Sequence, residues 1–453
     1  MTELPTSWAR VTITDVLKPN SNGKPFQQGW SPQCEGVPAH EDQWGVLKTT
    51  AIQHGEFWDH ENKRLPDHLE PRHQIEVKPG DVLMTCAGPR SRCGVVCLVE
   101  RTRSKLMMSG KMYRFRPHPK VMNPKYLAYF IQTREAQLEI DRMKTGISDS
   151  GLNLTHDRFA TLKVPVATVN EQRRIVAKIE ELFFELDKGV ESLKLTRNQI
   201  EILDQSILEH AFADVKDSIE LRDLISQKLS NGYSGKPVKH TTDFRVLTLS
   251  ATTSGRFDEL KYKYLDEDGL EQRDIWCELN DILIQRGNTI EYVGVPAIYT
   301  GKPRMFIFPD LMIRARADEQ KVSTKYLYFA LSSPTVRNHL RLKAKGSAGT
   351  MPKISQRILN ELPIPYCSRK MQHEIVRGIE TRISNSSFIR DTLDANIEKS
   401  EALRQSILKC AFSGQLVAQN PNDEPASVLL ERIKAEKVGY VNDKKNNKRR
   451  DAA

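Results

Sequence analysis

The sequence has no apolar run long enough to cross a membrane. Its 453 residues are 39% apolar and 28% charged, and no apolar stretch approaches the roughly 18 residues that indicate a transmembrane helix. The N-terminal MTELPTSWAR also lacks the basic and then apolar pattern of a secretory signal. These absences predict a cytoplasmic protein with no membrane partner. A chain of this length has room for two or three domains, each with its own core.

Cysteine is scarce and scattered. The seven cysteines are odd in number and include no CxxC pair, which argues against a disulfide framework and against a zinc site. Other signatures are missing too, because the chain has neither a glycine-rich phosphate loop nor a DPPY- or NPPF-like methyltransferase tetrapeptide. We therefore expect no metal and no cofactor on this chain.

Acidic residues are missing from two stretches of a chain whose net charge is +10. No Asp or Glu lies between Glu100 and Glu135, where nine Lys and Arg residues occur, and none lies in 341–360. The tail 441–453 carries five Lys and Arg residues against two Asp residues and is expected to be disordered. This distribution favours a surface that contacts phosphate, so double-stranded DNA is a plausible partner. The alternative is an ordinary solvated basic surface.

The sequence repeats itself at a spacing of 200 residues. The octapeptide QSILEHAF at 205–212 returns as QSILKCAF at 405–412, and QRRIVAKIE at 172–180 returns as QHEIVRGIE at 372–380. Solenoid repeats have periods of about 20–50 residues, so this longer period indicates two copies of a whole unit. We predict an α+β fold, with two similar globular α/β domains separated by two long helices.

Each copy ends in a segment with a heptad pattern. No proline occurs from Asn170 to Ala213, and about 43 helical residues would form a rod of roughly 60 Å. Apolar residues seven apart allow two helices to pack along each other, and we expect an intramolecular antiparallel coiled coil. The alternative is that each helix packs only on its own domain. The predicted seam consists of Ile179, Leu186, Leu193, Ile200 and Ile207 in the first helix and Ile379, Leu393, Leu403 and Ile407 in the second.

These patterns divide the chain into six segments. The predicted segments are a first globular domain at 1–165, a first helix at 166–215, a second globular domain at 216–365, a second helix at 366–415, a segment with a short amphipathic helix at 416–440 and the basic tail at 441–453.

With these motifs the chain resembles the specificity (S) subunit of Type I restriction-modification systems. The resemblance covers essentially the whole chain, and one departure is Met371, which stands where the family and the first joint have Glu. The matching segments are the joints LKVPVATVNEQRRIVAKIEEL (162–182) and LPIPYCSRKMQHEIVRGIE (362–380), the helix ends LDQSILEHAFAD and LRQSILKCAFSGQLV, and NPNDEPASVLLERIKAEK (420–437).

The resemblance implies a subunit without catalytic activity. It implies two target-recognition domains, each of which reads one half of an asymmetric bipartite DNA site, and helices that act as a spacer. Those helices would also dock two methyltransferase (M) subunits and usually two restriction (R) subunits. S-adenosylmethionine, ATP and Mg²⁺ would be bound by these partners, which methylate adenine and cleave DNA.

Two aligned loops are candidates for reading bases. The segments 80–100 and 280–299 contain similar strands, but their loops differ in polar residues. Arginine bonds guanine and asparagine bonds adenine in the major groove. The predicted base contacts are Arg90, Ser91, Arg92, Arg286, Asn288 and Thr289, and the alternative is that these are ordinary exposed hairpin residues.

Further basic residues are candidates for phosphate contacts, which position a protein on DNA without reading its sequence. They are Lys24, Lys48, Lys144, Ser148, Lys236, Lys343, Lys345 and Lys353. Arg114 and Arg116 recur as Arg314 and Arg316, and we expect the members of each pair to face opposite sides of a strand. At most one arginine of each pair would then be available to DNA.

One short motif favours a different function. Asp67, Glu76 and Lys78 match the two carboxylates and the lysine with which Mg²⁺-dependent nucleases polarise water. The second copy has Trp276 and Glu278 in place of Glu76 and Lys78, so the repeat does not preserve this chemistry. A self-contained nuclease is therefore the alternative function.

Overall fold

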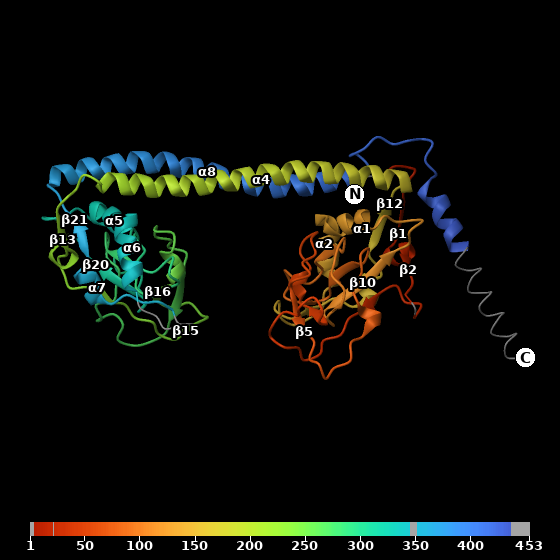
Figure 1. The fold of residues 1–453 in the computed structure, drawn as a ribbon, viewed down its shortest axis with the longest axis horizontal. Coiled ribbons are helices and arrows are strands. Elements are labelled where there is room, and N and C mark those ends of the chain that lie inside the picture. The colour runs from red at the N-terminus through yellow and green to blue at the C-terminus, as the bar shows by residue number, and fades with distance from the viewer. Residues whose placement is uncertain (1–3, 21, 345–350, 436–453) are drawn as a thin grey trace, which may run out of the picture. The chain divides into compact units, whose positions relative to one another are not determined.

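The computed structural model describes residues 4–20, 22–344 and 351–435 (Figure 1). Contacts within the chain divide it into two units, Met1–Glu191 with Ile397–Ala453 and Ser192–Asn396. The basic tail predicted for 441–453 lies outside the described residues. Among the helices of the described part, none is long and apolar enough to span a membrane.

The first unit is built on a small antiparallel sheet covered by helices α1 (Pro124–Gln132) and α2 (Arg134–Met143). Strands β2, β10, β6 and β8 pair in that order, β3 also pairs with β10, and β5, β4 and β9 form a second sheet with its own core. The remaining bounds are β1 (Ala9–Thr12), η1 (Ile13–Val16), β2 (Leu17–Lys18), β3 (Gln27–Gln28), β4 (Gly45–Leu47), η2 (Thr49–Ala51), β5 (Asn62–Arg64), η3 (His73–Ile75), β6 (Val82–Thr85), β7 (Ala87–Gly88), β8 (Val96–Leu98), β9 (Leu106–Met107), β10 (Met112–Pro117), β11 (Leu152–Asn153), α3 (His156–Phe159) and β12 (Lys163–Val166).

The second unit has the same plan, with helices α5 (Thr324–Ser332) and α6 (Pro334–Lys343) beside a sheet of order β14, β20, β18, β19. Strands β15, β17 and β16 form a separate antiparallel sheet. The remaining bounds are β13 (Ser218–Glu220), η4 (Leu221–Asp223), β14 (Ser230–Asn231), β15 (Pro237–Val238), β16 (Phe244–Leu247), η5 (Leu249–Ala251), β17 (Tyr262–Leu265), β18 (Ile282–Gln285), β19 (Pro296–Ile298), β20 (Met312–Ala315), α7 (Gln356–Asn360) and β21 (Pro363–Pro365).

The 200-residue repeat of the sequence is also a repeat of structure. Two helices of 44 residues, α4 (Val169–Phe212) and α8 (Arg369–Phe412), begin and end at corresponding positions. Strands β6, β8 and β10 likewise begin 200 residues before β18, β19 and β20. The predicted α+β fold with two similar domains and two long helices is confirmed.

A buried glutamine ties the start of each long helix to its domain. The amide of Gln172 accepts the N–H of Asn123 at 2.8 Å and donates to the carbonyl oxygens of Val121 and Ala167 at 2.8 and 2.9 Å. Gln372 makes the same three bonds in the second unit. Both glutamines are fully buried, so losing either amide would leave backbone groups without partners.

The end of each long helix packs on the opposite copy's domain helix, which explains why the octapeptide occurs twice. In the first unit the ring of Phe412, at the end of α8, lies 4.9 Å from Tyr126 and 5.4 Å from Phe130. In the second unit Phe212, at the end of α4, lies 5.4 Å from Tyr326. These edge-to-face contacts are favourable and are buried in each domain's core.

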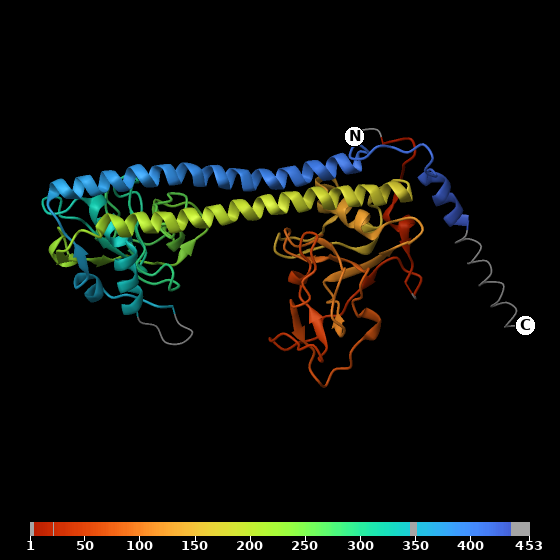
Figure 2. The same ribbon diagram turned by 45° about the horizontal axis from the view of Figure 1, so that its top comes forward.

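The two long helices run side by side in opposite directions within each unit (Figure 2). In the first unit Arg404 pairs with Asp187, and its guanidinium lies 4.6 Å from the ring centroid of Phe183. In the second unit Arg197 pairs with Asp394 at 3.1 Å. The predicted antiparallel coiled coil is confirmed.

The predicted seam residues are buried or half-buried with one exception. Leu403 is 44% exposed, and its assignment to the seam was wrong. Position 404 lies on the seventh-residue series through Ile383, Arg390 and Ile397, so Arg404 takes the inward place. The seam residues with restricted exposure are Ile179, Leu186, Leu193, Ile200, Ile207, Ile379, Leu393 and Ile407.

One ion pair lies inside the seam of the second unit. Arg390 pairs with Asp204, and their side chains are only 25% and 16% exposed. The second oxygen of Asp204 and the Nε of Arg390 are buried without a hydrogen-bond partner. Such a pair adds little net stability compared with apolar residues, but it penalises any slip that separates the two charges.

We expect Asp204→Ala to lower the free energy of unfolding by about 3 kcal/mol, because it leaves the Arg390 guanidinium uncompensated in the seam. Urea unfolding of the full chain, followed by far-ultraviolet circular dichroism, measures this change. Asp394→Ala is the matched control, because it removes an exposed pair on the same coil and should cost only about 0.5 kcal/mol. Equal effects of the two substitutions would contradict a structural role for the buried pair.

The C-terminal segment closes over the beginning of the first domain, within the first unit. Residues 426–435 are helical, and Ala426, Leu429, Leu430 and Ile433 are buried in the same core as Trp8. The N–H of Ala426 donates to the carbonyl oxygen of Ser7 at 2.9 Å.

Two carboxylates lock this segment to the start of α4. Glu171 is fully buried and accepts hydrogen bonds from Trp8 Nε1 and Gln419 Nε2 at 2.9 and 2.5 Å, and burial raises its pKa. Asp423 accepts hydrogen bonds from Thr168, Asn170 and Arg174 at 3.1, 3.2 and 2.9 Å. Although burial alone raises the pKa of Asp423, these bonds together lower it below its ordinary value.

The second helix start lacks this lock but keeps the same cap. Met371, which replaces Glu at this position, is 40% exposed. Its N–H donates to Ser368 Oγ at 3.4 Å, as the N–H of Glu171 donates to Thr168 Oγ1 at 3.2 Å. The departure at Met371 therefore removes a buried acid without removing the N-terminal cap.

We expect Asp423→Asn to lower the free energy of unfolding by about 2 kcal/mol at neutral pH, because it loses the charged bond to Arg174. A carboxylate whose pKa is lowered by folding stabilises the folded state at any pH above its pKa in the unfolded chain, which is about 3.9 for Asp. That stabilisation is lost as the pH falls through the pKa in the folded state. The difference from the wild type should therefore hold down to about pH 5 and shrink below about pH 4.

Urea unfolding at each pH measures this difference. Glu424→Gln serves as the control, since it breaks the surface pair with Arg432, in which both side chains are about half exposed. A difference for Asp423→Asn that grows as pH falls would contradict the stabilising role of the ionised carboxylate.

Candidate nucleic-acid interface

Each domain contains one buried aspartate in the turn before its central strand. Asp81 is fully buried, accepts the N–H of Lys78 at 3.0 Å, and binds Arg114 and Arg116 at 3.1 and 2.6 Å. Asp281 holds Arg316 at 2.7 Å in the same way. The buried aspartate therefore fixes the end of β10 or β20 against the turn.

The arginine pairs were expected to face opposite sides of their strands, and this was wrong. Arg114 and Arg116 are two residues apart, and in a strand such residues lie on the same face. Arg114 is buried and also donates to the carbonyl oxygens of Gln74 and Glu76, and Arg314 is buried against Asp274 at 2.6 Å. Arg114 and Arg314 are therefore structural.

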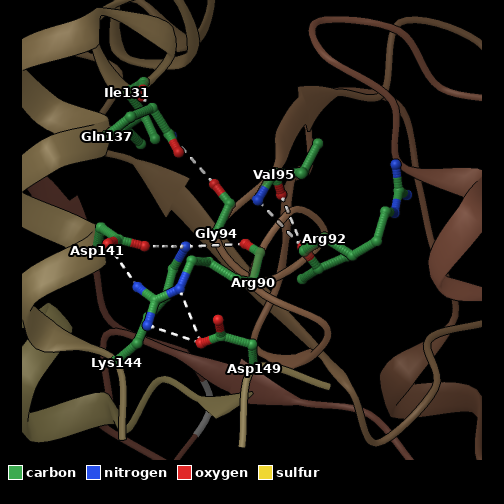
Figure 3. Close-up of polar contacts among 10 residues, drawn as sticks. Arg90, Arg92, Gly94, Val95, Ile131, Gln137, Asp141, Lys144 and Asp149 are labelled. Atoms are coloured by element: carbon green, nitrogen blue, oxygen red, sulfur yellow. Dashed lines mark hydrogen bonds and ion pairs between the residues drawn. The ribbon is translucent and has the colours of Figure 1, made fainter. Parts of the chain in front are cut away.

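The first predicted reading loop is fastened to helix α2 (Figure 3). Arg90 pairs with Asp141 at 2.6 Å and with Asp149 at 3.0 Å, and these carboxylates raise its pKa. Lys144 pairs with Asp141 at 2.9 Å and donates to the carbonyl oxygen of Arg90 at 3.1 Å. The Lys144 side chain is only 5% exposed, so its ammonium is not presented to a phosphate.

Arg92 is also used within the protein. Its guanidinium donates to the carbonyl oxygens of Thr49 and Ile52, both at 2.5 Å, and to Gln53 Oε1 at 3.3 Å. Burial lowers the pKa of Arg92. The arrangement does not favour a base contact by Arg92, because both terminal nitrogens of its guanidinium already bond groups of the same domain, whereas Ser91 in the same loop is exposed.

The second predicted loop leaves fewer polar groups free than the sequence indicates. Asn288 donates to Gln285 Oε1 at 2.6 Å and accepts the N–H of Thr289 at 2.8 Å, so both ends of its amide are engaged. Arg286 is half-buried and makes one long bond, 3.4 Å, to the carbonyl oxygen of Asp310. Thr289 is exposed.

The predicted phosphate contacts divide by exposure. Lys48 pairs with Glu61 at 3.4 Å, and Ser148 Oγ lies 2.9 Å from Ser150 Oγ. Lys345 lies outside the described residues. The remaining candidates are exposed, namely Lys24, Lys236, Lys343 and Lys353.

The residues of the nuclease motif are bound to separate partners. Asp67 is held by Arg64 at 2.8 Å, and Glu76 accepts the N–H of Lys105 at 2.8 Å. Within the described residues, no group of three or more His, Cys, Asp or Glu side chains is placed to hold a metal ion. The geometry therefore gives the nuclease alternative no support.

Sequence reasoning missed a basic surface in the second domain. Two adjoining cavities of about 550 and 430 Å³ share Arg304 in their linings. Arg245 and Lys302 line the first, and Lys228 and Arg273 line the second. These residues come from separate strands and turns, so no run or period in the sequence brings them together.

Comparisons with known proteins find similarity to specificity subunits of type I restriction enzymes. No family model matches the chain. The Type I restriction enzyme EcoEI specificity subunit of Escherichia coli is 37% identical over 182 residues, which are 40% of this chain and 30% of that protein. The EcoKI specificity subunit of Escherichia coli strain K12 is 24% identical over 447 residues, covering 90% of this chain and 92% of that protein.

A solved structure shows the same fold. It is described as the structural basis of complex assembly and conformational transition of the type I R-M system. It matches with a TM-score of 0.64 and 17% identity, and the match covers 91% of this chain and 99% of that chain.

We expect Arg92→Ala to lower the free energy of unfolding by about 2 kcal/mol, because it removes the guanidinium bonds to the carbonyl oxygens of Thr49 and Ile52. Arg90→Ala is the control, since the Arg90 side chain is 48% exposed and its removal should cost clearly less. Urea unfolding measures both, with duplex binding measured on the folded variants. An Arg92→Ala variant of unchanged stability but altered sequence preference would favour a base contact instead.

Proposed function

This chain belongs to the family of type I restriction enzyme specificity subunits, and we propose that it is the DNA-recognition subunit of such an enzyme. The observation that carries the proposal is that the structural framework of the two domains is duplicated while their loops differ. The glutamine joints, the aromatic helix ends and the buried aspartates recur at a spacing of 200 residues, whereas the loops between corresponding strands differ.

The unlike loops support an asymmetric bipartite target. Identical domains would read the same word twice, whereas these domains present Ser91 in one loop and Thr289 with Arg286 in the other. In this proposal each domain reads one half-site, and the coiled coil, which belongs to both units, sets the spacing between the halves.

The coiled coil also supports docking of partner proteins. Large apolar side chains on its outer faces are exposed, with Phe184 at 57%, Ile202 at 66% and Phe388 at 75%. Exposed apolar side chains that gather on one element are typical of protein contacts. We propose that they bind two methyltransferase subunits and two restriction subunits, which would themselves bind S-adenosylmethionine, ATP and Mg²⁺.

The proposal is tested by expressing the chain with the methyltransferase subunit of its own system and mapping methylated adenines. We expect two short sequence words at a constant separation. Cleavage of plasmid by the purified chain with Mg²⁺ alone would favour the nuclease alternative, and an uninterrupted short word would contradict a bipartite target. If the chain does not bind duplex DNA at any salt concentration, it would instead be a coiled-coil adaptor that binds only proteins.

We expect replacement of Arg286 and Thr289 by alanine to relax one word of the methylated site and leave the other unchanged. The physical reason is that base-edge contacts in one domain are local, at about 1–3 kcal/mol for each good contact. Lys343→Ala is the control, because loss of an exposed charge should weaken binding equally at cognate and scrambled sites. Relaxation of both words by the double variant would contradict one domain per half-site.

A further inference from the structure

The turn 301–305 of the second domain carries cations that the protein leaves open. Lys302 is exposed, and its ammonium has no hydrogen bond or ion pair within the described residues. Arg304 is also exposed, and its guanidinium lies 5.2 Å from the ring centroid of Trp276 and donates to the carbonyl oxygen of Glu271 at 2.7 Å. Stacking and one carbonyl bond orient this guanidinium and leave most of its five donors free.

The corresponding turn of the first domain uses its cations internally. Arg103 donates to the carbonyl oxygens of Ala39 and Gln43 at 3.4 and 3.1 Å, and Lys105 donates to that of Asp42 at 2.7 Å. Both residues thereby hold the segment 39–43 against the domain. In the second domain Lys302 and Arg304 of the corresponding turn stay exposed, and the bond from Arg304 to the carbonyl oxygen of Glu271 holds this turn to a neighbouring segment.

The surroundings of this turn carry a surplus of positive charge. The two cavities that meet at Arg304 are lined by seven cationic and three acidic side chains. One further acid, Asp281, is buried beneath Arg316 and compensates it. The surplus therefore remains positive, and the potentials of nearby cations add in clefts of this kind.

Aromatic rings restrict the arginine side chains at the edge of this surface. The guanidinium of Arg245 lies 5.3 Å from the ring centroid of Tyr262, and that of Arg273 lies 4.8 Å from the ring centroid of Tyr233. Arginines that are oriented by stacking lose less rotamer freedom when they bind an oxyanion. The surface is thus suited to an anion with several oxyanion groups in a row, which separate arginines can bind at the same time.

The backbone at Arg304 is held in an unusual conformation. Its φ is +55°, a value that side-chain-bearing residues seldom adopt, and its N–H donates to the carbonyl oxygen of Cys277 at 2.8 Å. Lys105, in the corresponding turn of the first domain, has a φ of +61°, so this conformation belongs to the turn that both domains share. Here the strained turn projects Arg304 between the two cavities.

We propose that this surface is a phosphate seat that binds successive phosphodiesters of one DNA strand. Lys302 and Arg304 are its centre, Arg245 lies on one side, and Lys228 and Arg273 lie on the other. The inference rests on the proposed function and adds to it a contact surface in the second domain that does not read bases. Phosphate contacts of this kind set the register and orientation of the domain on the duplex.

The test uses the full chain in complex with its methyltransferase subunit and the double variant Lys302→Ala/Arg304→Gly. Glycine tolerates a positive φ, so this variant removes the guanidinium without adding backbone strain. Binding of a labelled cognate duplex and of a scrambled duplex is measured by fluorescence anisotropy from about 50 to about 300 mM KCl, a range over which phosphate contacts change affinity strongly. Urea unfolding checks that the variant is as stable as the wild type.

We expect the slope of log affinity against log salt to become shallower by about 1.8, because each lost phosphate contact contributes about 0.9. Cognate and scrambled duplexes should weaken by the same factor, about tenfold or more at the lower salt concentrations. The matched control is Lys216→Ala/Arg222→Ala, which removes two exposed positive charges of the same domain from outside the two cavities.

Three results would overturn the phosphate seat while leaving the proposed function intact. They are an unchanged slope in the double variant, an equal change in the control, and a loss confined to the cognate duplex, which would indicate base reading. A wild-type complex that binds neither duplex in a salt-dependent way would instead contradict the proposed function itself.

Discussion

Each domain is anchored by a buried glutamine in the first turn of one long helix and an aromatic ring in the last turn of the other. In the first unit Gln172 and Phe412 make this attachment, and in the second unit Gln372 and Phe212 make it. Both ends of each long helix are therefore packed against a domain. The heptad spacing, the paired octapeptides and the Arg390–Asp204 pair all belong to these two helices.

A frame constrained in this way leaves other parts of each domain free to differ. Asp81 and Asp281 hold the same strand against the same turn, so both domains present their loops from equivalent strands. The loops of the two domains then differ in whether their Lys and Arg side chains bond within the domain or stay exposed. Arg103 and Lys105 bind carbonyl oxygens of their own domain, whereas Lys302 and Arg304 remain on the surface. Similar frames can thus carry different contact surfaces.

The fold was largely predictable because it depends on repetition and periodicity, which are visible in one dimension. The shift by 200 residues located both domains, and the heptad spacing located the coil. Leu403 was misplaced because the second helix has polar residues in its seam, so an apolar side chain one position away looked like the better match. The candidate contacts were less predictable. Arg92 and Lys144 look like loop cations in the sequence, yet each binds backbone carbonyl oxygens of another segment of its domain.

The sequence by itself determined the duplication, the helices and the joints, because each of these follows from residue spacing along the chain. Only the tertiary structure decided which arginines and lysines are available to a ligand. A cation is free or engaged according to the carbonyls and carboxylates that folding brings near it, and these can lie far along the chain, 64 positions away for Arg103 and Ala39 and 249 for Arg174 and Asp423. Arg304 stays exposed because the fold brings its guanidinium one carbonyl acceptor, that of Glu271, and the ring of Trp276.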